Sequence, residues 1–173
     1  MAIAKRLGED YEVHALDLRN HGRSPWADAM RYQDMAQDVA AYIESNGLAS
    51  PTVLGHSMGG KVAMSLALTT PDIVGRLVVA DISPVPYQRE GRTSFLDYID
   101  AMMALDLAPI TRRSEADKAM ADAIPDKAVR GFLLQNLVPD EANGGFYWRC
   151  NLPALSNRMA DILDAPEPDS WAP

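Results

Sequence analysis

Ser57 lies between two glycines, at the point where a short apolar segment is followed by a segment with helical spacing. Gly55-His56-Ser57-Met58-Gly59 has the form G-x-S-x-G, with the short apolar run 51–55 before it and helical spacing over 58–70 after it. A strand, a sharp turn and a helix in this order hold a serine hydroxyl clear of the sheet edge, where it can attack a carbonyl carbon. The spacing therefore predicts a nucleophilic serine at position 57.

The sharp turn restricts the backbone conformation of the serine and the size of the residues around it. We expect Ser57 to adopt a strained backbone conformation. Side chains at positions 55 and 59 are expected to collide across the turn, which favours Gly55 and Gly59. Gly60 is expected to let the following helix pack closely on the sheet. The Met58 N–H lies in the first helical turn, where it can face a developing oxyanion and gain from the helix dipole.

Asp81 is the candidate acid. It ends the apolar run Arg76–Asp81, at the carboxyl edge where ligands collect in open α/β sheets. A carboxylate there can orient a histidine and stabilise its imidazolium. The alternative is that Asp81 only caps the turn into Ser83-Pro84.

The other polar residues near these positions are expected to be structural. Asp17, Arg19 and His21 are predicted to organise a turn beside the pocket. His56 is expected to pack with its ring turned away from the reacting atoms. His14 lies within an apolar run and is predicted to be a core or face residue.

The runs that position these residues alternate in type. Residues 11–18 are short and β-rich, residues 32–45 repeat apolar positions at helical spacing and end at Asn46-Gly47, and residues 51–55 and 76–81 are apolar strands on either side of the helix 58–70. The order strand, helix, strand, helix, strand is typical of a parallel sheet with crossover helices. The near-continuous apolar run at 76–81 favours a strand covered on both faces.

The pattern changes after Ser83. Helical stretches with methionine and aromatic residues run to about Leu163, with no clear strand among them, and some of these side chains are expected to line an acyl pocket. Residues 1–8 have the spacing of a helix end, and residues 165–173 are rich in proline, as connectors are.

Composition excludes several classes of function. The net charge is −8 and no Lys/Arg run stands out, so nucleic acid is not an expected partner. No apolar stretch reaches the length of a membrane span. The single cysteine, Cys150, allows no internal disulfide and favours a cytoplasmic setting, and with three histidines a metal site is not expected.

Two motifs carry a resemblance to a known family. Gly-His-Ser-Met-Gly-Gly-Lys (55–61) and Asp-Leu-Arg-Asn-His-Gly-Arg-Ser-Pro (17–25) resemble the α/β-hydrolase superfamily, and more narrowly its small bacterial YbfF-type esterases. Residues 79–84 and 148–152 are similar to further stretches of that group. The resemblance implies a partial α/β-hydrolase core over residues 1–83, a helical cap over 84–165 and a connector over 166–173.

The same resemblance implies a chemistry. It implies hydrolysis of a small-molecule carboxylic ester or thioester through an acyl-serine intermediate, with Ser57 as nucleophile, Asp81 as acid, and no cofactor or metal. It gives no oligomeric state. A serine at position 57 disfavours the halide- and epoxide-opening branches of the superfamily, which use an aspartate at the nucleophile position.

One expected catalytic group is missing from the sequence. A serine hydroxyl needs a positioned base, and in this superfamily the histidine follows the serine and the acid. No histidine follows Ser57. We therefore expect a chain truncated at both ends, lacking its histidine, its second oxyanion donor and the last strands, and showing little or no turnover alone.

Two alternatives remain open from the sequence. One is another reaction on the same scaffold, such as carbon–carbon bond hydrolysis or perhydrolysis, which Ser57 does not distinguish from ester cleavage. The other is a non-catalytic binding protein that keeps the serine turn. The missing histidine favours this second alternative, and the retained glycines argue against it.

Overall fold

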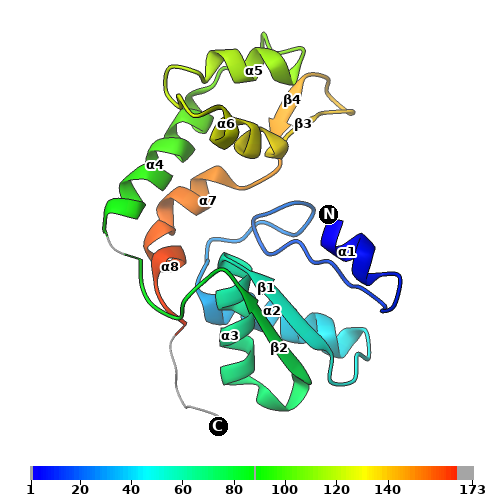
Figure 1. The fold of residues 1–173 in the computed structure, drawn as a ribbon. Coiled ribbons are helices and arrows are strands. Elements are labelled where there is room, and N and C mark those ends of the chain that lie inside the picture. The colour runs from blue at the N-terminus through cyan, green and yellow to red at the C-terminus, as the bar shows by residue number, and fades with distance from the viewer. Residues whose placement is uncertain (1, 88, 167–173) are drawn as a thin grey trace.

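The chain forms two groups of elements, one after the other (Figure 1). The computed structural model describes residues 2–87 and 89–166. We name residues 2–82 the core lobe and residues 89–163 the helical lobe. The core lobe contains α1 (Ala2–Leu7), α2 (Tyr32–Ser45), β1 (Thr52–His56), α3 (Met58–Thr69), the 3₁₀ turn η1 (Pro71–Ile73) and β2 (Arg76–Ala80). The helical lobe contains α4 (Arg89–Ala104), α5 (Arg113–Ala119), α6 (Lys127–Leu133), η2 (Leu134–Asn136), β3 (Leu137–Pro139), β4 (Phe146–Trp148), α7 (Leu152–Asn157) and α8 (Met159–Leu163).

A parallel strand pair with a crossover helix organises the core lobe. β1 and β2 pair in parallel from Thr52 opposite Arg76 to His56 opposite Ala80, and α3 connects them. Helix α3 packs against both strands, and α2 packs against α3. This arrangement confirms the predicted α/β class with parallel strands and crossover helices.

The predicted helices of the core lobe form where the apolar spacing placed them. Helix α2 buries Met35 and Ile43 and ends at Asn46, followed by Gly47 at φ 63°. Helix α3 ends at Thr69, before Pro71, because proline disfavours a helical conformation in the residue before it. Both helix predictions are therefore confirmed.

Among the described residues, three apolar clusters hold the elements together. Ala36, Ile43 and Leu66 form one cluster between α2, α3 and β1. A second cluster joins the lobes, because Leu155 of α7 and Ile162 of α8 pack against its buried members in the core lobe: Met30, Tyr32, Met35 and Val62. The third lies within the helical lobe, where Met120, Ile124 and Leu137 are among its most buried members.

The strand predicted over residues 11–18 does not form. Residues 12–18 have no ladder partner among the described residues, and Tyr11 is 69% exposed. The segment instead lies along α2, where a ring nitrogen of His14 hydrogen-bonds the Tyr42 hydroxyl at 2.9 Å. An apolar, β-rich sequence becomes a strand only where a neighbouring strand accepts its hydrogen bonds, and this condition is not visible in the run itself.

The predicted burial of β2 on both faces is also wrong. Leu77 and Val78 keep 41% and 42% of their surface exposed, and Leu54 of β1 keeps 49%. Helix α3 covers part of the strand surface, and the described elements leave these apolar side chains uncovered.

A small hairpin corrects the expectation that residues 83–163 contain no clear strand. β3 and β4 pair antiparallel, with Leu137 opposite Trp148. The Asp140 carboxylate accepts the N–H groups of Ala142 and Asn143, and Gly144 and Gly145 have φ values of 77° and 78°. Strands of three residues give no visible alternation, but the Asn-Gly-Gly turn at 143–145 was a readable hairpin signal.

Among the residues that the structure describes, no helix combines the length and the apolar character that crossing a bilayer requires.

Candidate active site

Ser57 stands in a strained turn between β1 and α3. Its backbone has φ 51° and ψ −123°, a combination that residues with a side chain rarely adopt, and the residue is exposed. The Ser57 N–H donates to the Ala80 carbonyl of β2 at 3.0 Å, and its carbonyl accepts the N–H of Gly60 at 2.8 Å. The predicted strained conformation is thus confirmed.

The glycines of the turn differ in what they do. A Cβ on Gly55 would lie 2.1 Å from the Gly59 carbonyl oxygen and 2.6 Å from the Gly60 nitrogen, so the predicted close approach exists at position 55. A Cβ on Gly59 would meet nothing within 4 Å, so the clash predicted for this position is not found. At Gly60 a Cβ would lie 2.6 Å from the side chain of Ile82, just after β2, and 3.3 Å from that of Val79 on β2, which fits close packing of α3 on this strand.

Asp81 occupies the same sheet edge as Ser57. The strand register ends with His56 opposite Ala80, so Ser57 and Asp81 each follow the last pair on adjacent strands. Asp81 has φ 54°, and its side chain is 91% exposed. Both residues therefore have a strained backbone and lie next to each other at the carboxyl ends of parallel strands. Backbone strain of this kind is often found at functional sites.

His56 corrects the expectation that its ring packs. The side chain is 68% exposed, and its Nε2 lies 3.7 Å from Oδ2 of Asp81. An exposed pair at this separation stabilises the fold little. The contact nevertheless shows that the Asp81 carboxylate stands within reach of an imidazole at the sheet edge.

Met58 begins helix α3, directly after Ser57. The N–H of the first residue of a helix has no acceptor within the helix. The positive end of the helix dipole adds to its attraction for negative charge. The position of Met58 is thus compatible with the oxyanion role that the sequence predicts.

The turn over residues 17–25 is held by polar contacts, as the predicted structural role requires. The Asp17 carboxylate accepts the Arg23 N–H at 3.0 Å. Arg19 makes hydrogen bonds of 2.6 and 2.8 Å to the Asp38 carboxylate on α2, and these bonds raise the pKa of the guanidinium. His21 hydrogen-bonds the Arg19 carbonyl at 2.9 Å, which places its ring within the turn.

Asn20 connects two motifs that the sequence analysis quoted separately. It is fully buried at φ 65°, and its Oδ1 accepts both the Ala27 N–H and the Nδ2 of Asn151. The Asn151 N–H also donates to the Asn20 carbonyl at 2.9 Å. Sequence reasoning missed both asparagines. The Asn–Asn contact ties the 17–25 turn to the first turn of α7, whose N-cap is Asn151.

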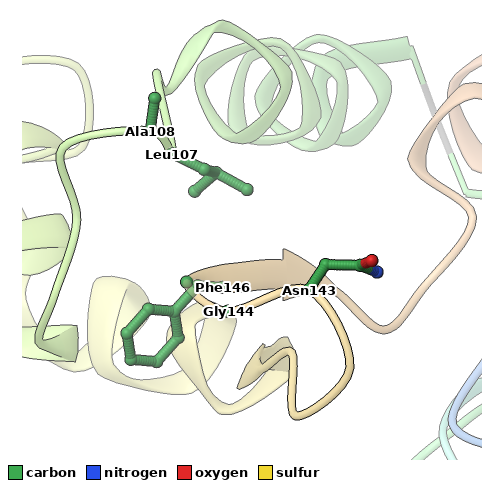
Figure 2. A pocket seen from close by; sticks show the side chains of 6 residues that line it. Leu107, Ala108, Asn143, Gly144 and Phe146 are labelled. Atoms are coloured by element: carbon green, nitrogen blue, oxygen red, sulfur yellow. The ribbon is translucent and has the colours of Figure 1, made fainter.

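Two hollows in the described part of the chain lie away from Ser57 and Asp81, and the second is lined in part by Asp17 and Arg19 of the 17–25 turn. One of about 430 Å³ lies in the helical lobe between Leu107, Ala108 and the hairpin turn of residues 143–146 (Figure 2). The other, of about 620 Å³, lies between residues 15–27 and α2. Ser57 and Asp81 line neither, so the predicted acyl pocket under the helices is not identified with either hollow.

The parallel strands, the crossover helix and the strained serine turn are typical of an α/β hydrolase. Comparison with known proteins leads to the same class. Residues 1–160 match the family described as alpha/beta hydrolase fold, and the chain belongs to that family. A solved structure described as a marine microorganism esterase superposes with a TM-score of 0.89 at 35% identity, covering 95% of this chain and 64% of the other.

Two curated relatives are similar over nearly the whole chain. The sn-1-specific diacylglycerol lipase ABHD11 of Xenopus laevis is 40% identical over 96% of this chain and 53% of its own length. The esterase YbfF of Escherichia coli K12 is 31% identical over 98% of this chain and 63% of its own length. The resemblance to YbfF-type esterases is therefore confirmed. The chain spans about half to two thirds of the length of these relatives.

Proposed function

We propose that this chain is the nucleophile-bearing part of a serine hydrolase that cleaves carboxylic esters or thioesters. The observation that carries the proposal is the Ser57 backbone at φ 51° and ψ −123°, between a sheet strand and a helix N-terminus, with Asp81 at the end of the adjacent strand. The names of the relatives, which are lipases and esterases, support the substrate class.

The proposed reaction assigns one role to each residue. The Ser57 hydroxyl oxygen attacks the carbonyl carbon, and its proton passes to a histidine base. The Met58 N–H stabilises the negative charge on the carbonyl oxygen, and Asp81 stabilises the imidazolium. The leaving alcohol or thiol takes the proton, and water then hydrolyses the acyl-serine.

In α/β hydrolases the catalytic histidine follows the serine and the acid in the chain, and His14, His21 and His56 all precede Ser57. We therefore propose that the histidine of this reaction comes from outside these 173 residues. We also propose a partial hydrolase core over residues 1–83, a cap over residues 84–165 that contains the helical lobe, and a cytoplasmic setting. The connector assigned to 166–173 lies, apart from Pro166, outside the described residues.

Turnover by the isolated chain is the first test. We expect hydrolysis of a short-chain nitrophenyl ester to be close to that of the Ser57→Ala variant, because a general base alone contributes roughly 10² to 10⁴-fold. Initial rates of both proteins, corrected for the spontaneous reaction, provide the measurement. Fast turnover that depends on Ser57 would show that the chain needs no external histidine.

A second test asks whether Ser57 is a competent nucleophile. Imidazole, added as an external base, is expected to accelerate fluorophosphonate labelling of the chain in proportion to its concentration. Labelling should vanish in Ser57→Ala. It should persist in Ser50→Ala, a matched control because Ser50 is also exposed at positive φ, at the opposite end of β1. Labelling that stays absent, or that survives Ser57→Ala, would favour a non-catalytic binding protein.

A further inference from the structure

A buried lysine lies four residues after Ser57 on α3. Lys61 is fully buried, and its backbone N–H donates to the Ser57 carbonyl at 3.2 Å. Lysine is rarely buried in full unless its ammonium has partners. Here Nζ donates to the carbonyl of Val85 at 2.9 Å and to the carbonyl of Asp164. It also lies 4.8 Å from the ring centroid of Tyr87.

The two carbonyls belong to two segments that lie against α3 at the junction of the lobes. Val85 lies on the segment that connects β2 to α4, and Asp164 directly follows α8. We call residues 83–87, together with residues 162–165 at the end of α8 and just after it, the neck. The neck segments also bind each other, because the Tyr87 N–H donates to the Leu163 carbonyl at 2.8 Å. The Tyr32 hydroxyl at the start of α2 donates to the Ile162 carbonyl.

We propose that Lys61 is a positioning residue whose ammonium fixes both neck segments to helix α3, and so sets the placement of the helical lobe relative to Ser57. The effect of Lys61 on the reactivity of Ser57 rests on the proposed function. Its effect on the neck rests on the contacts alone. One ammonium can serve both carbonyls because it carries three donors.

The charge and the surroundings of the lysine fit this role. Burial lowers the pKa of Lys61, and the negative charge of Asp164 acts against that shift. Burial also raises the pKa of Tyr32, whose ring centroid lies 5.5 Å from Nζ, so this hydroxyl keeps its proton and its hydrogen bond. The ammonium is thus held by two backbone carbonyls and two aromatic rings, and the negative charge of Asp164 adds to the attraction. Methionine has a similar length and no donor, so Lys61→Met would leave both carbonyls without this partner.

Amide hydrogen exchange of the full chain tests the neck directly. In Lys61→Met we expect the Tyr87 amide to exchange at least tenfold faster, with the interior of the helical lobe, such as the Ile124 amide, unchanged. Lys61→Arg keeps a charged donor group and should retain part of the protection. Lys118→Met, an exposed lysine on α5, is the matched control and should change neither region.

A reactivity measurement separates positioning from general stability. Short- and long-chain alkyl fluorophosphonates are compared with imidazole present, and Lys61→Met is expected to change the ratio of their labelling rates at least threefold. A residue with only a structural role would lower both rates together. If Ser57 is not labelled at all, the proposed function fails, while the exchange experiment still decides the role of Lys61 in the neck.

Two results would overturn the proposal. One is unchanged exchange of the neck in Lys61→Met. The other is exchange that rises equally everywhere, since that would make Lys61 an ordinary core residue. Should Lys61→Met fail to fold, Lys61→Gln, which keeps one donor group on a shorter side chain, is expected to give the same neck-selective exchange. Global unfolding of both variants would also refute the inference.

Discussion

Gly55→Ala is expected to lower the free energy of unfolding by about 3 kcal/mol and to abolish fluorophosphonate labelling of Ser57. The alanine Cβ would lie 2.1 Å from the Gly59 carbonyl oxygen and 2.4 Å from its carbonyl carbon. Both atoms belong to the backbone, so no side-chain rotation relieves the clash, and overpacking of this kind costs about 1 to 3 kcal/mol or more. The strained turn itself must move.

Gly59→Ala is the matched control for this prediction. A Cβ there meets nothing within 4 Å, and the residue lies in the first turn of α3. Alanine favours a helix over glycine by up to about 1 kcal/mol, so this variant should be unchanged or slightly more stable. Urea unfolding of both variants provides the measurement. Equal destabilisation by the two substitutions would contradict the steric account of the turn.

The turn could be predicted because its causes are local. A strand, the G-x-S-x-G pentapeptide and a helix are adjacent in sequence, and the strain at Ser57 follows from that order alone. The position of Asp81 beside Ser57 needed one further inference, that consecutive apolar runs around a crossover helix pair in parallel. The register of β1 with β2 confirms that step.

The errors arose where the outcome depends on partners distant in sequence. Residues 11–18 have a strand-like composition, but a strand requires a ladder partner, and the described chain supplies none. The apolar run of β2 correctly indicated a strand and wrongly indicated its burial, because burial depends on what packs over it. His56 was expected to pack, and its exposure follows from the open surface at the sheet edge.

The contacts between the lobes could not be read from the sequence. Lys61 is the last residue of the serine motif 55–61, but its carbonyl partners lie 24 and 103 residues away. Asn20 and Asn151 are separated by 131 residues. A single lysine or asparagine belongs to no periodic pattern from which its partner could be predicted. The available signal was that Asn20, Lys61 and Asn151 all lie inside the stretches that carry the family resemblance.

Asn20→Ala is expected to destabilise the protein by about 3 to 4 kcal/mol. Its side chain satisfies both backbone groups of Ala27, with Oδ1 accepting the N–H and Nδ2 donating to the carbonyl, each at 2.8 Å. A buried polar group left without a partner costs about 1 to 3 kcal/mol. Alanine is also less suited than asparagine to φ 65°, at a cost of roughly 1 kcal/mol. The fall in urea midpoint measures the sum.

Asn151→Asp isolates the share of this energy that joins the lobes. Aspartate keeps an oxygen that can accept the Ala154 N–H as the α7 cap, and it loses the Nδ2 donor to Asn20 Oδ1. It should therefore cost less than Asn20→Ala, about 1 to 2 kcal/mol, because Ala27 keeps its partners. In the double variant the two effects should fall short of their sum, since they remove the same bond. Full additivity would mean that the Asn–Asn bond stabilises nothing, and that apolar contacts such as those of Leu155 and Ile162 carry the lobe interface by themselves.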